Sequence, residues 1–279
     1  MTAAGRPVRN IAVIATLAVA IYAGLCAFVY AAQSEFVYHP HAHLAATPAA
    51  VGLAYQNVEI PTRDGLQLHG WFVPDPAARG TVLFFHGNGG NISHYLSSLP
   101  ILHQLRLNVL LFDYRGYGGN AGTPSEQGTY RDAMAAWRYL TRTRKIAPRR
   151  LVLLGRSLGG AVAAYAAERE RPAALILEST FRSIPSMIHV RAPWLPAHLV
   201  ARYQYNTLAR MPHIHCPVLI AHSPDDEVIP YAAGRALYAA ANRPKVFLKL
   251  RGRHDTGFLT SGNTYRRGLD QFLTKYLGT

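Results

Sequence analysis

The sequence is short of acidic residues. Only 15 Asp and Glu residues oppose 29 Lys and Arg residues, so the 279-residue chain has a formal net charge of +14. The basic side chains are scattered, and no long charge block or nucleic-acid-binding motif is present. We therefore expect no nucleic acid as a partner. We attribute the basic excess to a solvated surface or to loose attraction toward anionic lipid headgroups.

Cysteine is almost absent as well, since the chain contains only Cys26 and Cys216. Cys26 lies inside an apolar run and Cys216 lies just before an expected strand, so the pair predicts neither a disulfide nor a zinc site. Three histidines, His39, His41 and His43, alternate in a proline-flanked segment that would hold a metal only loosely. We therefore expect no metal and no cofactor.

One long uncharged run covers residues 11–32. A helix of about 22 residues spans a hydrocarbon core of roughly 30 Å, whereas the apolar part of a cleaved signal peptide usually has about 7–15 residues. The run therefore predicts an uncleaved transmembrane anchor. A cleaved signal, which would leave a secreted or periplasmic protein, stays open as the alternative.

The charges beside this run predict its orientation. Arg6 and Arg9 precede it, and the next basic residue after it is Arg63. Because positive charge favours the cytoplasmic side, we expect the N-terminus inside and the following domain outside the cytoplasm.

The remaining chain divides into a short linker and one domain. We expect a tail over residues 1–10, the anchor over 11–32, a linker over 33–53 and a folded domain over 54–279. In this domain, short apolar runs alternate with helical stretches, which predicts an α/β fold: a mostly parallel, eight-stranded sheet with helices on both faces. The expected strands cover residues 55–60, 66–73, 81–85, 109–112, 151–154, 174–177, 218–221 and 246–250, and the expected helices cover 93–105, 126–144, 158–168, 231–241 and 263–277.

Residues 181–215 interrupt this alternation. Several prolines stand there among apolar and basic residues, and prolines at that density prevent long helices. An insertion of this kind after a late strand suits a lid over a pocket. We call residues 181–215 the lid segment.

The strongest chemical signal is a serine between two glycines. An apolar strand runs into Gly155-Arg156-Ser157-Leu158-Gly159, and an alanine-rich helix follows. Such a G-x-S-x-G turn exposes the serine hydroxyl above the sheet, and side chains at the glycine positions would collide with neighbouring backbone. Ser157 is therefore the expected nucleophile. The competing interpretation is a glycine-rich turn in which Ser157 only caps the helix.

A serine hydroxyl needs a base, and the base needs an orienting acid. His254 follows the last expected strand, and Asp226 follows the strand before it, which gives the order Ser, Asp, His known for this motif. We expect His254 to be the base and Asp226 the acid. Asp225 is the first alternative acid, and Glu178 could replace either. Asp255 adjoins His254, but we expect it to be a helix cap or a surface residue rather than the acid.

An acyl-transfer site also needs two amides that stabilise an oxyanion. We expect these from Leu158, which follows the serine, and from Asn88 in the small-residue loop 86–91. His86 in the same loop is expected to be structural rather than a base.

Several of these segments resemble the α/β-hydrolase superfamily, in particular the single-domain, membrane-anchored "alpha/beta-hydrolase domain-containing" serine hydrolases. The similar pieces are Phe-Val-Tyr-His-Pro (36–40), FFHGNGGN (84–91), FDYRGYGGNAGTPSEQG (112–128), GRSLGG (155–160), HSPDDEVIP (222–230) and GRHD (252–255). The resemblance covers roughly residues 54–279. It implies hydrolysis of an ester, thioester or amide through an acyl-serine intermediate.

The apolar lid segment and the anchor favour a hydrophobic acyl substrate, a small molecule or a lipid. Two other interpretations remain open at this point. One is a serine peptidase of the prolyl-oligopeptidase type, which usually carries an additional gating domain. The other is a non-catalytic, membrane-anchored scaffold, against which the intact Ser, Asp and His set argues.

Overall fold

A computed structural model describes residues 5–277 of the chain. Its centre is an eight-stranded sheet with the order β10-β9-β8-β7-β4-β6-β3-β2. All neighbouring pairs are parallel except β2 with β3 and β3 with β6. The strands are β2 (Gln56–Pro61), β3 (Gln67–Val73), β4 (Gly80–Phe85), β6 (Leu107–Phe112), β7 (Leu151–Arg156), β8 (Ala174–Glu178), β9 (Val218–His222) and β10 (Lys245–Lys249).

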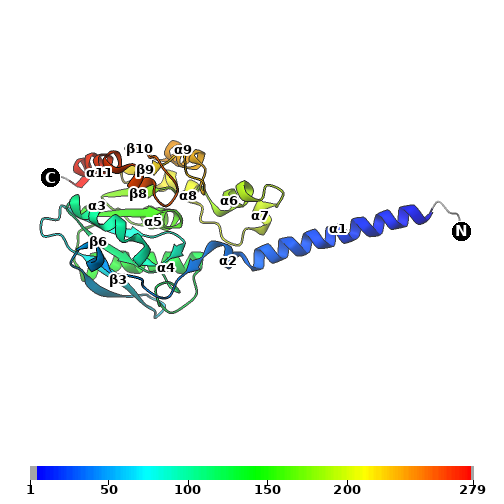
Figure 1. The fold of residues 1–279 in the computed structure, drawn as a ribbon, viewed down its shortest axis with the longest axis horizontal. Coiled ribbons are helices and arrows are strands. Elements are labelled where there is room, and N and C mark those ends of the chain that lie inside the picture. Colours follow the sequence, from blue (N-terminus) through cyan, green and yellow to red (C-terminus); the bar gives the residue numbers. More distant parts are fainter. Residues whose placement is uncertain (1–4, 278–279) are drawn as a thin grey trace.

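Helices cover both faces of this sheet (Figure 1). One apolar core joins α4 (Glu126–Arg138), α5 (Leu158–Arg169) and α9 (Tyr231–Ala240) to one face. A second core joins α3 (Leu99–Gln104), α10 (Gly257–Thr260) and α11 (Gly262–Leu277) to the other. Successive residues of the central strands alternate between the two cores, so both faces are buried and the strand sequences are continuously apolar. The α/β fold expected from the sequence is confirmed.

The expected strands lie within two residues of the observed ones, whereas two helices differ more. The stretch 93–105 begins as a 3₁₀ segment, η2 (Ile92–Ser98), and becomes α-helical only at α3, which has Pro100 in its first turn. The stretch 126–144 ends as an α-helix at Arg138 and continues as a π-helical turn, η3 (Tyr139–Thr143). The sequence pattern marked helical regions correctly but did not distinguish these local windings.

The segment 33–53 packs on the domain more closely than a linker does. It contains α2 (Gln33–Val37) and the short β1 (His39–Pro40), which pairs in parallel with β5 (Gly89–Gly90), and later η1 (Pro48–Val51). Val37 and Tyr38 are buried. Backbone pairing therefore ties this segment to the loop that follows β4, while the Tyr38 ring packs against Tyr203 and Tyr205.

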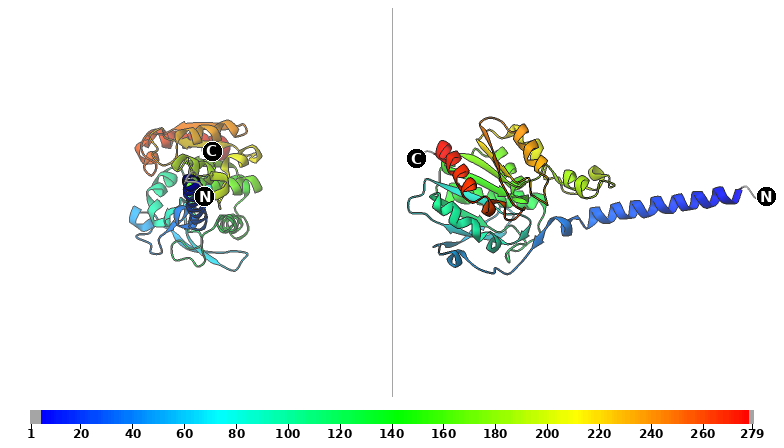
Figure 2. Two further views of the ribbon diagram at one scale, coloured as in Figure 1. Left: turned by 90° about the vertical axis from the view of Figure 1, so that its right-hand side faces the viewer. Right: turned by 45° about the horizontal axis from the view of Figure 1, so that its top comes forward.

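The lid segment folds into three short α-helices, α6 (Ile184–Arg191), α7 (Ala197–Val200) and α8 (Thr207–Arg210), followed by a 3₁₀ helix, η5 (Met211–His213). Its prolines lie at or beside helix ends, such as Pro185 in the first turn of α6 and Pro196 immediately before α7. The long helix α1 (Gly5–Ala31) projects away from the domain on the side where α6 and α7 lie (Figures 1 and 2). Residues 9–31 are long and apolar enough to cross a membrane, and none of that stretch is buried in the protein.

A buried ion pair ties the end of β6 to α4. The Asp132 carboxylate accepts hydrogen bonds from the Arg115 amide at 2.9 Å and from its guanidinium at 2.7 Å. Asp64 contacts the same guanidinium at 2.9 Å but is more exposed. Asp132 is therefore the partner that compensates the buried charge.

We expect Asp132→Ala to lower the free energy of unfolding by about 3–5 kcal/mol, because it leaves a buried guanidinium without its main counter-charge. Urea denaturation of the full chain in detergent measures this change. The matched variant Asp64→Ala should cost clearly less, and an equal loss for both would contradict the assignment.

Candidate active site

Ser157 stands on a sharp turn between β7 and α5. Its backbone has a φ of +54°, a region that residues with side chains rarely adopt. The flanking glycines make the turn possible, since a Cβ at Gly155 would collide with the Gly159 backbone and a Cβ at Gly159 with the Phe85 carbonyl. The turn is held by a hydrogen bond from the Ser157 amide to the Glu178 carbonyl at 2.9 Å. The strained turn thus places the Ser157 hydroxyl above the end of the sheet.

The structure brings three sequence-predicted side chains together at this point. His254 Nε2 lies 3.1 Å from Ser157 Oγ. The other ring nitrogen, Nδ1, lies 2.9 Å from Asp226 Oδ2 and 3.0 Å from Oδ1. The side chains of His254 and Asp226 are buried, while Ser157 is half-buried and open to solvent. A chain of hydrogen-bonding groups therefore runs from the carboxylate to the hydroxyl.

The surroundings keep Asp226 ionised. Burial alone would raise the pKa of its carboxyl, but hydrogen bonds from His222, His254 and the Ile229 amide outweigh burial and hold the pKa below its usual range. The Ile229 and Val228 amides both donate to Oδ1, at 2.8 and 3.0 Å. A fixed carboxylate of this kind orients an imidazole and stabilises its protonated form.

The alternative acids are engaged elsewhere. Asp225 Oδ2 accepts from the Gly252 amide at 3.2 Å. Glu178 accepts from Arg156 at 2.7 Å and from Tyr265. Asp255 is exposed and lines a cavity beside His254. Of these carboxylates, the structure places only Asp226 against the His254 ring.

His86 is buried away from the reacting hydroxyl. Its Nδ1 lies 2.7 Å from the Gly87 carbonyl, and its Nε2 lies 3.5 Å from Asp113. Burial lowers the pKa of the His86 imidazole to about 3 and raises the pKa of Asp113 to about 8. Burial therefore disfavours the charged form of both groups, which agrees with a structural role for His86.

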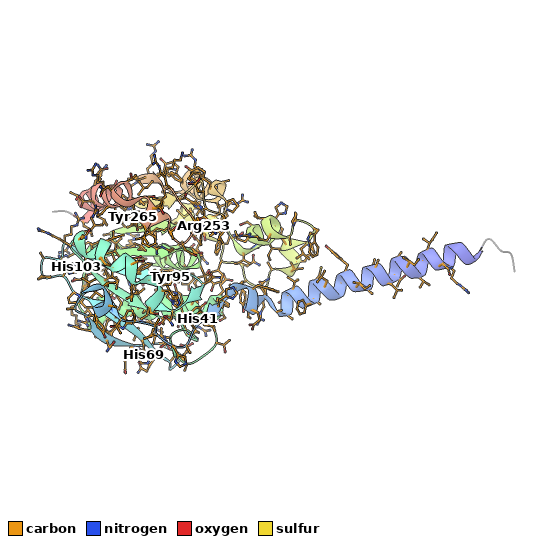
Figure 3. The ribbon with its side chains drawn as sticks, viewed as in Figure 1. His41, His69, Tyr95, His103, Arg253 and Tyr265 are labelled. Carbon is orange, nitrogen blue, oxygen red and sulfur yellow. The ribbon has the colours of Figure 1, made fainter. Side chains whose placement is uncertain are left out.

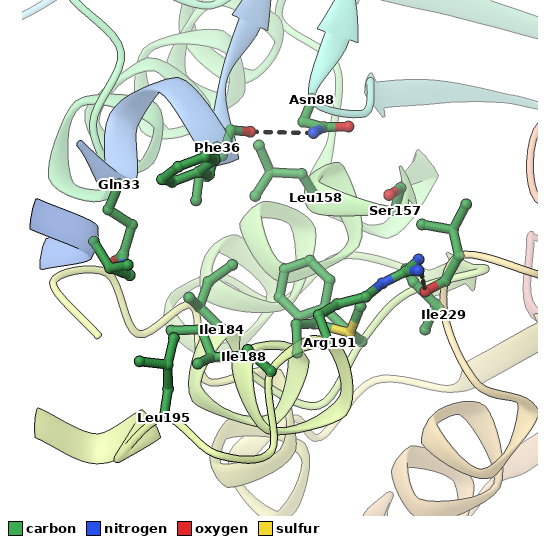
Figure 4. Close-up of a pocket in the computed structure, with 16 residues that line it drawn as sticks. Gln33, Phe36, Asn88, Ser157, Leu158, Ile184, Ile188, Arg191, Leu195 and Ile229 are labelled. Carbon is green, nitrogen blue, oxygen red and sulfur yellow. Dashed lines mark hydrogen bonds between the residues drawn. The ribbon is translucent and has the colours of Figure 1, made fainter. Parts of the chain in front are cut away.

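Asn88 and Leu158 both border the cavity beside Ser157 (Figure 4). Asn88 lies in a loop that is held by other segments. The Asn88 side chain donates a hydrogen bond to the Val37 carbonyl at 3.1 Å, and the Asn88 carbonyl accepts one from the His39 amide at 3.0 Å. Tyr117 Oη also donates to that carbonyl, at 2.8 Å. The segment 33–41 therefore positions the loop, a function that linker-like composition did not predict.

A buried network below Ser157 was also missed from the sequence. The Arg156 guanidinium pairs with Glu178 at 2.7 Å and stacks over the Phe258 ring at 3.8 Å. Tyr265, from α11, donates to the other oxygen of Glu178. Figure 3 shows Tyr265 in the C-terminal helix layer. The network ties the serine turn to β8 and to the helices that follow His254.

A cavity of about 470 Å³ opens beside Ser157 toward α1 and the lid segment (Figure 4). Most of its walls are apolar. They come from the lid segment, from α2 and, through Val29, from the end of α1. The lining side chains include Val29, Phe36, Phe181, Ile184, Met187, Ile188 and Leu195.

A second cavity, of about 540 Å³, also borders Ser157. Its walls are more polar and include His39, His41 and His94, together with His254 and Asp255. Ser157 and Asn88 border both cavities. Among residues 5–277, no group of three or more His, Cys, Asp or Glu side chains is arranged to hold a metal ion.

Comparison with known proteins gives the family. Residues 76–208 match the family described as serine aminopeptidase, S33. The chain is 37% identical over 252 residues to the alpha/beta hydrolase domain-containing protein WAV2 of Arabidopsis thaliana, and the match covers 82% of each chain. It is 36% identical over 239 residues to an uncharacterized protein of Mycobacterium tuberculosis, with 85% of each chain covered.

The structure is similar to that of the Pyrococcus furiosus esterase Pf2001. The TM-score is 0.72 at 20% sequence identity, and the match covers 87% of this chain and 98% of that one. This similarity establishes the fold, while the identity to the curated relatives extends over most of the chain. The chain belongs to the α/β-hydrolase family.

Proposed function

We propose that this hydrolase cleaves an acyl ester or thioester, with a hydrophobic acyl group, through a covalent intermediate on Ser157. The observation that carries the proposal is the continuous contact from Asp226 through His254 to Ser157 at the mouth of an apolar cavity. Each residue type has the chemistry its place requires: a fixed carboxylate, an imidazole and an exposed hydroxyl.

In the first step, His254 Nε2 takes the proton from the Ser157 hydroxyl while Oγ attacks the acyl carbonyl carbon. The tetrahedral intermediate collapses as the protonated imidazole gives its proton to the leaving alcohol or thiol, and an acyl-serine ester remains. His254 then takes a proton from water as the water oxygen attacks the acyl carbonyl carbon. This second tetrahedral intermediate collapses as the protonated imidazole returns its proton to Ser157 Oγ, which releases the carboxylic acid and restores the serine hydroxyl. The Asp226 carboxylate holds the ring orientation and stabilises the imidazolium in both steps.

The negative charge on the carbonyl oxygen needs fixed donors. Two features support the Leu158 and Asn88 amides in that role. Leu158 is the first residue of α5, where helix-terminal amides lack partners within the helix and the helix dipole favours an anion. The Asn88 loop lies beside the serine and is held by Val37, His39 and Tyr117.

The two cavities suggest how the substrate is divided. The apolar cavity suits an acyl chain, because burying such a chain removes apolar surface from water. The histidine-lined cavity suits a more polar leaving group. Ser157, which borders both cavities, then stands at the bond that is cut.

We further propose that α1 is an uncleaved membrane anchor with its N-terminus inside and the catalytic domain outside the cytoplasm. The orientation rests on Arg6 and Arg9, which precede the apolar run. Two contacts support an uncleaved helix: Val29 forms part of the cavity wall, and Tyr22 donates a hydrogen bond to the Trp194 carbonyl of the lid segment at 2.8 Å. A signal peptide removed after Ala31 would take both contacts away.

Peptidase activity is the second candidate, because the matching family is described as a serine aminopeptidase. The same three side chains can cleave an amide. Comparison of matched ester and amide substrates of one acyl group decides between them: amide turnover equal to ester turnover would favour the peptidase.

Substitution of the serine tests the proposal directly. We expect Ser157→Ala to reduce ester hydrolysis by roughly 10⁴-fold or more, since the nucleophile is lost. Hydrolysis of p-nitrophenyl butyrate measures the effect, with circular dichroism as a check of folding. Unchanged turnover in this variant would contradict the proposed mechanism.

Two neighbouring substitutions test which carboxylate is the acid. Asp226→Asn should lower kcat by roughly 10³- to 10⁴-fold, because the imidazole loses its orienting charge. Asp225→Asn changes the neighbouring carboxylate and should stay within about threefold of wild type, as an exposed substitution does. If the larger loss belonged to Asp225→Asn, the acid would have been assigned wrongly.

The apolar cavity predicts a preference for long acyl chains. We expect p-nitrophenyl dodecanoate to have a higher kcat/KM than the acetate, and Ile188→Trp to reverse this order by filling the cavity. Acetate turnover in the same variant is the internal control and should stay nearly constant. Equal turnover of both chain lengths in wild type would refute the hydrophobic acyl specificity.

A further inference from the structure

The lid segment is joined to the anchor helix as well as to the catalytic domain. Tyr22, near the middle of the apolar stretch of α1, donates to the Trp194 carbonyl, and α7 contacts α1. The buried Gln33 side chain donates to the Val200 carbonyl at 3.0 Å and accepts from the Tyr203 amide at 2.7 Å. The two segments therefore form one structural unit on the same side of the domain (Figures 1 and 2).

The outer surface of this unit has the composition of a membrane interface. Leu199 is 80% exposed, Trp194 57% and Val190 44%. Phe36 of α2, which also borders the apolar cavity, is 58% exposed. Basic side chains accompany them on the lid segment: His189, Arg191, His198 and Arg202 are exposed. Aromatic and aliphatic side chains next to basic ones are typical of segments that lie among lipid headgroups.

The position of Tyr22 along α1 indicates how far the lid segment extends into the membrane. Ala31 ends the helix nine residues beyond Tyr22, which corresponds to about 13 Å at the rise of an α-helix. If the lid segment stayed entirely in water, only residues 9–22 would remain to cross the bilayer. They rise about 20 Å, which is too short for a hydrocarbon core of roughly 30 Å. A spanning α1 therefore brings Trp194 into the leaflet.

We propose that the tip of the lid segment is immersed in the leaflet that faces the catalytic domain, and that the apolar cavity receives its acyl chain laterally from a lipid in that leaflet. The second half of this inference rests on the proposed function. The cavity has the required position, since its walls come from the anchor at Val29 and from the lid segment at Ile188 and Leu195. An acyl chain can thus pass from lipid to Ser157 along apolar surface.

Tryptophan fluorescence tests the immersion without any catalysis. The chain has three tryptophans, of which Trp71 and Trp137 are only 2% and 3% exposed within the domain. With the full chain reconstituted in phosphatidylcholine vesicles, bromine-labelled acyl chains should quench a fraction of the emission. Trp194→Phe should remove that fraction. Identical emission in brominated and ordinary vesicles overturns the proposal. This is the result expected if a second copy of the chain, rather than lipid, covers Trp194.

A matched pair of variants tests lipid delivery. Leu199→Asp should lower hydrolysis of 4-methylumbelliferyl palmitate embedded in vesicles by about tenfold, because a carboxylate in the leaflet is unfavourable. Hydrolysis of the water-soluble acetate of the same alcohol should stay within about twofold of wild type. Leu259→Asp makes the same change at an exposed leucine of α10, and should leave both rates unchanged. Equal loss on palmitate in the two variants overturns lateral delivery.

These experiments distinguish failure of the membrane immersion from failure of the proposed function. If wild type hydrolyses neither ester while Trp194 is quenched by brominated lipid, the immersion stands and the proposed function is wrong. If both esters are hydrolysed while Trp194 is not quenched, the enzyme assignment stands and the immersion is wrong.

Discussion

The strained turn at Ser157 is the constraint on which the site depends. Its positive φ is unfavourable for a residue with a side chain, and it persists because backbone packs against backbone at Gly155 and Gly159. The turn is also held from β8: the Glu178 carbonyl accepts from the Ser157 amide at 2.9 Å, and Thr180 Oγ1 donates to the Ser157 carbonyl at 2.6 Å. The hydroxyl is thereby fixed where the His254 ring reaches it.

The parts of the molecule that follow local rules could be predicted from the sequence. Continuous apolar runs marked the strands because both faces of the sheet are covered, and the alternation with helices gave the fold. Ser157 was recognisable because its turn requires glycine on both sides. His254 and Asp226 were recognisable because the loops that carry them follow successive strands, whose ends meet at one edge of a parallel sheet. The structure brings all three side chains into contact.

The parts that depend on contacts between distant segments could not be predicted. Nothing local to Val37 and His39 reveals that they hold the Asn88 loop, because their partners lie about fifty residues away. Likewise, the sequence leaves Glu178 as a candidate acid, because its contacts with Arg156 and Tyr265 become visible only in the structure. The junction of Tyr22 with Trp194 joins residues 172 positions apart, so apolarity alone gave an anchor and a lid segment but not their association.

The central claim is that geometry makes one hydroxyl of this chain reactive. The most direct measurement is the reaction of the folded, full chain with a fluorophosphonate, followed by mass spectrometry of its tryptic peptides. We expect a single adduct on Ser157, formed far more slowly when His254 is replaced by alanine and not formed on unfolded protein. An adduct on another residue, or no adduct on the folded chain, would contradict it.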